Sequence, residues 1–258
     1  MATDMEELVD DLVSEQDYLD NQLRDVPAAA WATPSPAEGW LLRDCIAHLA
    51  EMDVSAATIA ATGSGPTGGG AAAPPLSGRQ VEARKLKIAE RIGYWRDGRA
   101  QLAAAVRPLE GRARLPWAGN TMSVRSFTTA RLMEAWSHGL DAIDAAGGTH
   151  KDSDRLKHIA QIGIMTRDYA YRAHQLEPNP EPMRVELEAP SGSLWTWGPE
   201  DARIRITGYA GDFCRVVTQR ISYLDTDLKT EGEAAVEFLQ VAQAFAGPPG
   251  KGRPPKRS

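Results

Sequence analysis

A change in hydrophobic period near residue 180 is the feature that most constrains the fold of this chain. Before it, apolar residues recur three or four positions apart, as in the pairs Leu8/Leu12 and Leu19/Leu23 near the start. After the prolines of segment 178–182, apolar and polar residues alternate, as in 183–188. Helical spacing indicates amphipathic helices, whereas alternation indicates half-buried strands. The sequence therefore predicts an α+β protein whose N-terminal part is helical and whose small C-terminal part is α+β.

The helical part is expected to form a four-helix bundle. A fifth helix is expected at 152–175, and the alternating segments after it are expected to pair as an antiparallel sheet. Between the second and third bundle helices lies a loop at 63–78, rich in Gly, Ala and Pro. Such a composition cannot pack into a core, so this loop is either a connector or a mobile lid. The bundle helices are predicted at about 5–23, 42–62, 79–106 and 123–146.

We expect two domains and a tail. The proline-rich break suggests a bundle domain at 1–176 and a small α+β domain at 177–246. The end of the chain, 247–258, combines prolines and glycines with basic residues, a composition typical of a disordered tail.

Charge and hydropathy exclude some partners. The 258 residues carry a formal net charge of −6, which argues against a nucleic-acid partner, because phosphate binding needs a clustered positive field. No apolar run approaches the length of a membrane helix, and the acidic N-terminus does not resemble a signal peptide. We therefore expect a cytoplasmic protein without a membrane partner. Its two cysteines, Cys45 and Cys214, are expected to be free, packed thiols.

One predicted helix carries a metal-ligand pattern. Glu134 and His138 are four residues apart, and Asp141 follows three residues later, so all three share one helix face. His48, in the apolar second helix, can supply a further ligand. Two histidines and one carboxylate form the shell of an open catalytic zinc site. The alternative is an ordinary Glu–His helix pair and a core histidine that binds no metal.

Two neighbours of His48 leave alternatives open. Asp44 lies one turn before His48, where it can orient a metal ligand or place a charge near the helix N-terminus. Cys45 can reach a metal, or it can be a small buried residue.

The motifs resemble those of a known family. The segment from Glu38-Gly39-Trp40 to His48, together with Arg131-x-x-Glu134-x-x-x-His138-x-x-Asp141, resembles the N-terminal domain of mycothiol-dependent maleylpyruvate isomerases. Those domains are DinB-like metal-binding four-helix bundles. Gly208-x-Ala210-x-Asp212 and Arg220 resemble their C-terminal domain. The chain is also similar to an uncharacterised actinobacterial subfamily whose C-terminal part is sometimes labelled a wyosine-base-formation segment, although the acidic charge balance argues against an RNA role.

The resemblance implies specific roles. It assigns His48, Glu134 and His138 as ligands of zinc or another divalent metal, and it places Asp141 beside the site, holding a ligand or a water. It implies that an arginine recognises the thiol cofactor or substrate, and Arg220, followed by Arg215, is the candidate.

The activity implied is that of a thiol-dependent isomerase or S-transferase. Its metal would activate mycothiol, a low-molecular-weight thiol, for attack on a small electrophilic substrate. The alternatives are a metal-dependent hydrolase, a non-catalytic metal-binding or scaffold protein that forms a homodimer through bundle faces, and a bundle without metal.

Overall fold

The computed structural model describes residues 4–64, 84–117 and 120–256. It divides into two compact units, Met1–His150 and Lys151–Ser258. Each unit is described by itself below.

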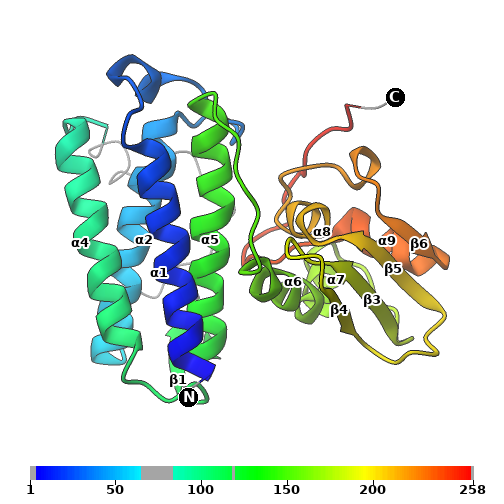
Figure 1. The fold of residues 1–258 in the computed structure, drawn as a ribbon. Helices are drawn as coiled ribbons and strands as arrows, with labels where there is room; N and C mark the ends of the chain where they lie inside the picture. Colours follow the sequence, from blue (N-terminus) through cyan, green and yellow to red (C-terminus); the bar gives the residue numbers. More distant parts are fainter. Residues whose placement is uncertain (1–3, 65–83, 118–119, 257–258) are drawn as a thin grey trace. The chain divides into compact units, whose positions relative to one another are not determined.

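The first unit is a bundle of four long helices (Figure 1). Helix α1 packs against α4 and α5, and α2 packs against the same two helices. The predicted four-helix bundle is thus confirmed. The bounds of the helices are α1 Asp4–Leu23, α2 Leu42–Thr62, α4 Ile88–Val106 and α5 Val124–Ala145.

The apolar faces of these helices meet in a core closed at one end by two tryptophans. Trp31 and Trp40, from the segment between α1 and α2, are 4% and 3% exposed. They join the same buried cluster as Leu49, Trp95 and Ile143, which come from α2, α4 and α5. The segment before α2 is therefore part of the core, and it covers side chains on more than one helix.

The third helix differs from the prediction, and a pair of short strands follows it. The helix begins at Ile88 rather than near residue 79, and the backbone N–H of Lys87 donates to Glu90 Oε2 at 3.0 Å to cap it. Residues 79–83, and the 63–78 loop beyond residue 64, lie outside the described residues. Before α5, two short antiparallel strands pair with each other, β1 (Arg114–Trp117) and β2 (Asn120–Ser123). Ser123 then caps α5 by accepting from the Ser126 N–H.

The second unit contains a four-stranded sheet in the order β4-β3-β5-β6. The sheet is mixed, so the antiparallel prediction is wrong: β4 runs antiparallel to β3, but β5 pairs with β3 in parallel. Because β4 and β5 lie on opposite edges of β3, the chain must cross from one edge of β3 to the other between them. Gly198 makes this turn with φ +78°, where a Cβ would lie 2.0 Å from the Met183 carbonyl oxygen. The strands are β3 Met183–Glu188, β4 Leu194–Trp197, β5 Ile204–Tyr209 and β6 Lys229–Glu231.

The boundary between the units lies at residues 150/151 rather than near 176. The expected helix at 152–175 breaks at Thr166 into α6 (Leu156–Met165) and α7 (Arg167–Ala173). Helix α6 packs on α8 (Ala210–Val217), and α7 on α9 (Glu233–Val241), so both belong to the second unit. Gly163 allows the close approach, because a Cβ there would lie 2.7 Å from Val217. The 178–182 prolines therefore form a loop inside the second unit.

The end of the chain is hydrogen-bonded rather than disordered as predicted. Residues 247–256 contain no helix or strand, but the Gly247 N–H donates to the Tyr169 hydroxyl and the Lys256 N–H donates to Asp225. Residues 257–258 lie outside the described part. Within the described residues, no helix has the length and apolar composition needed to cross a bilayer.

Candidate metal centre

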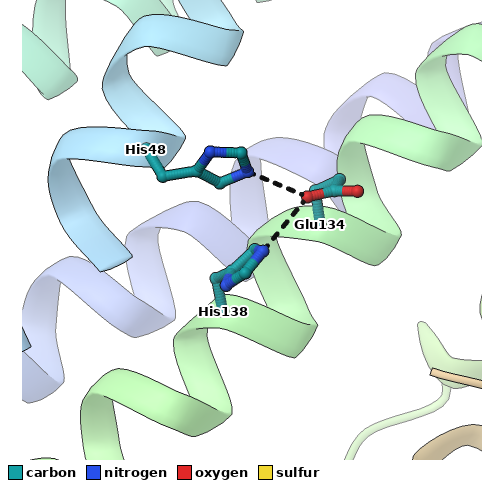
Figure 2. Close-up of side chains that lie close together, drawn as sticks. All are labelled: His48, Glu134 and His138. Atoms are coloured by element: carbon teal, nitrogen blue, oxygen red, sulfur yellow. Dashed lines mark hydrogen bonds and ion pairs between the residues drawn. The ribbon is translucent and has the colours of Figure 1, made fainter. Parts of the chain in front are cut away.

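The start of α2 places His48. The Leu41 N–H donates to Asp44 Oδ2 at 2.8 Å, and Arg84 donates to both oxygens of the same carboxylate. Asp44 is fully buried and caps the helix. Of the two roles expected for it, the structure therefore shows the charge at the helix N-terminus. One turn later, His48 projects from α2 towards α5 (Figure 2).

Three side chains from these two helices converge. His48 Nε2 lies 3.3 Å from Glu134 Oε2, and His138 Nε2 lies 3.4 Å from the same oxygen (Figure 2). One donor atom from each of the three lies within 4.8 Å of the others. The side chains are 23%, 20% and 13% exposed for His48, Glu134 and His138, so solvent reaches the cluster.

The spacing of the donor atoms fits a divalent metal. Zinc binds nitrogen and oxygen at about 2.0–2.1 Å, and a tetrahedral angle then separates neighbouring donors by about 3.3–3.4 Å. The two distances between Glu134 and the histidines match this separation. Three protein ligands would leave further coordination positions for water or a substrate, as in catalytic zinc sites.

The protonation states also suit a cation site. Burial lowers the pKa of His48 to about 4, so its imidazole is neutral at neutral pH. Burial alone would raise the pKa of Glu134, but hydrogen bonds and attraction from His138 and His48 hold it well below its ordinary value. A carboxylate and a neutral imidazole are the forms that bind metal.

Asp141 lies beside the candidate ligand His138, whereas Cys45 lies in the apolar core. Asp141 is 2% exposed, and its Oδ2 is 3.5 Å from Nδ1 of His138, on the ring edge opposite Glu134. A carboxylate in this position orients a ligand histidine and fixes its tautomer. Cys45 is fully buried in the apolar core cluster and is not part of the donor group.

The two candidate arginines lie in the second unit. Arg215, on α8, donates to both oxygens of Asp152 at 2.7 and 2.9 Å. Arg220 lies past the end of α8 rather than on a helix. The helix cannot continue to it, because Gln219 has a left-handed φ of 59°. Its guanidinium donates to the Thr218 carbonyl at 2.7 Å.

Sequence reasoning missed two features around the cluster. Trp40 packs on both histidines, a contact that no spacing rule gives. A buried ion pair joins Arg131, one turn before Glu134, to Asp53 on α2 at 3.1 Å. The available signal was the helical spacing of Asp53, which lies four residues from Leu49 and from Ala57 and therefore places a carboxylate on the apolar face.

Neither cysteine is expected to react in the folded protein. Both are buried, and burial raises the pKa of the Cys214 thiol well above its ordinary value, which suppresses the reactive thiolate. Titration with a disulfide reagent at pH 8 should therefore detect fewer than about 0.1 thiols per native chain and both thiols in guanidinium. Reaction of Cys214 in the native protein within minutes would contradict this prediction.

Comparisons with known proteins agree with the helical bundle. Residues 12–143 match the family model described as the mycothiol maleylpyruvate isomerase N-terminal domain, and residues 179–230 match a model described as wyosine base formation. Two uncharacterised proteins from strains of Mycobacterium tuberculosis are each 43% identical over 250 residues, covering 95% of this chain and 97% of theirs.

Solved structures share the fold. The crystal structure of the mycothiol-dependent maleylpyruvate isomerase has a TM-score of 0.59 at 19% identity, with 84% of this chain and 89% of that chain covered. A mutant of that isomerase gives a TM-score of 0.56 at 18% identity, with the same coverage. The family model spans just over half of the chain, and the alignments with the two relatives cover 95% of it. The chain therefore belongs to the mycothiol maleylpyruvate isomerase N-terminal domain family.

Proposed function

We propose that this protein is a metal-dependent enzyme that uses a low-molecular-weight thiol, of the mycothiol type, to isomerise or S-modify a small electrophilic substrate. The observation that carries the proposal is the convergence of His48, Glu134 and His138 in a chain of this family, with each histidine Nε2 at zinc-ligand spacing from Glu134 Oε2. The name of the structural neighbour adds mycothiol and maleylpyruvate as the first compounds to test.

The chain's own side chains would bind and orient the metal. His48 and His138 offer neutral nitrogens, Glu134 offers the anionic oxygen, and Asp141 holds the ring of His138. A zinc ion there would lower the pKa of a bound thiol, so that the thiol binds as its nucleophilic thiolate.

The buried cysteines support an external thiol. Cys45 and Cys214 are enclosed in the cores of their units, and the pKa of Cys214 is raised, so neither offers a ready nucleophile. A thiol-dependent reaction on this chain would need a thiol from a cofactor.

Arg220 remains our candidate for recognition of the cofactor or of a substrate carboxylate. Arg215 is the weaker candidate, because its two-pronged pair with Asp152 already occupies its guanidinium edge. An Arg220→Lys variant keeps the charge but loses the planar fork, so it separates carboxylate recognition from simple charge.

Calorimetric titration of the zinc-loaded protein with mycothiol tests the proposal. We expect saturable binding that disappears with S-methyl mycothiol, which cannot form a thiolate, and with the metal-stripped protein. Absence of heat with mycothiol, together with no mycothiol-dependent turnover of maleylpyruvate, would reject the thiol function. Hydrolytic activity without thiol would favour a metal-dependent hydrolase.

A further inference from the structure

The segment before α2 holds Trp40 in a closed loop. The Ser35 N–H donates to the Trp40 carbonyl at 2.8 Å, and the Leu42 N–H donates to the Thr33 carbonyl at 3.0 Å. Pro34 and Leu41 pair between these bonds. Gly39 turns the chain with φ +78°, a conformation that glycine adopts without strain. Backbone hydrogen bonds thus fix the point from which the indole projects.

The indole contacts both candidate histidine ligands. Its ring centroid lies 5.2 Å from that of His138, with only 14° between the planes, and 5.1 Å from that of His48, with 59° between them. The two imidazoles are 4.6 Å apart and steeply inclined to each other. One rigid, 3% exposed side chain therefore touches a ligand from α2 and a ligand from α5.

The two histidines differ in their other restraints. The buried carboxylate of Asp141 lies 3.5 Å from Nδ1 of His138, the ring nitrogen that does not face Glu134. For His48, the hydrogen bond recorded within the described residues is the one from Nε2 to Glu134, at the metal-facing edge itself. Ring contacts with Trp40 and with His138 therefore restrain the plane of the His48 ring, and that plane sets the direction of its Nε2 lone pair.

We infer that Trp40 is a positioning residue of the metal centre: it holds the imidazoles of His48 and His138 so that their Nε2 atoms converge on Glu134 before a metal binds. The inference rests on the proposed metal site. It assigns to a loop residue the orienting role that a carboxylate fills for His138, and preorganisation of this kind raises metal affinity.

The test uses the full chain loaded with Co²⁺, whose visible absorption reports ligand geometry. Trp40→Leu should weaken Co²⁺ binding on the order of 10-fold or more and alter the absorption bands, as loss of ligand-orienting contacts does. Trp40→Phe, which keeps an aromatic face, should restore part of both. Trp31→Leu is the matched control: Trp31 is equally buried in the same cluster, so its loss should lower stability without changing the cobalt spectrum.

A backbone variant covers the case in which Trp40→Leu does not fold. Gly39 and Gly147 both have positive φ and open space where a Cβ would lie. Gly39→Ala strains the loop that carries Trp40 and should alter the spectrum, whereas Gly147→Ala, at the end of α5, should not. Unchanged affinity and spectrum in both Trp40→Leu and Gly39→Ala would overturn the inference alone. Failure of the wild type to bind Co²⁺ or Zn²⁺ would overturn it together with the proposed metal site.

Discussion

Glu134→Gln is expected to abolish stoichiometric zinc binding, while the wild-type protein binds about one zinc per chain. Oε2 of Glu134 is the atom that both histidines approach, and it carries the only negative charge among the three donors. The glutamine amide has nearly the same size but is a poor, neutral ligand. Because loss of an orienting contact alone costs about 10–100-fold in metal affinity, loss of the ligand itself should exceed 100-fold.

Elemental analysis after dialysis against weak chelator measures this effect. Glu15→Gln is the matched control, because Glu15 is also a bundle glutamate paired with a histidine, His150, at 3.1 Å. That variant should keep its zinc even if it is less stable. Equal zinc in wild type and Glu134→Gln would leave Glu134 and His138 as an ordinary helix pair, and a zinc-free wild type would favour a scaffold function.

Local rules predicted much of the bundle and part of the site. Helix α2 begins and ends where its apolar period does, and Glu134 and His138 share a face because four residues make about one turn. These features depend on neighbours in sequence. His48 was chosen as their partner because it lies in an apolar helix, and the family resemblance supported that choice, since the sequence alone does not say which helix packs on α5.

Features that depend on tertiary packing were missed. The indole of Trp40 reaches both histidines only because the loop, α2 and α5 meet. The break at Thr166 has no proline to signal it, and the nearest glycine, Gly163, lies inside α6. The parallel pairing of β3 with β5 depends on a crossover, and the proline segment was mistaken for a domain boundary because it is a strong local break.

The buried ion pair beside the site carries the second large prediction. Arg131 is fully buried, and it donates from Nε and Nη2 to Asp53 Oδ1, while Gln16 donates to Asp53 Oδ2 at 3.0 Å. Asp53→Ala should lower the free energy of unfolding by about 3–5 kcal/mol, because it leaves the Arg131 charge buried and uncompensated. Urea unfolding of the metal-free protein measures the loss.

The same substitution should also weaken metal binding, and a double variant separates the causes. The charge of Arg131 is felt at His48, where it helps to lower the pKa, and Asp53 normally balances it. Without Asp53, that positive charge would oppose a divalent cation. Asp53→Leu combined with Arg131→Met removes both charges and should recover most of the stability and the metal affinity. If the double variant is no better than Asp53→Ala in either measurement, the pair acts through packing rather than charge. If it recovers stability but not affinity, Arg131 and Asp53 orient the neighbouring ligands as well as neutralising each other.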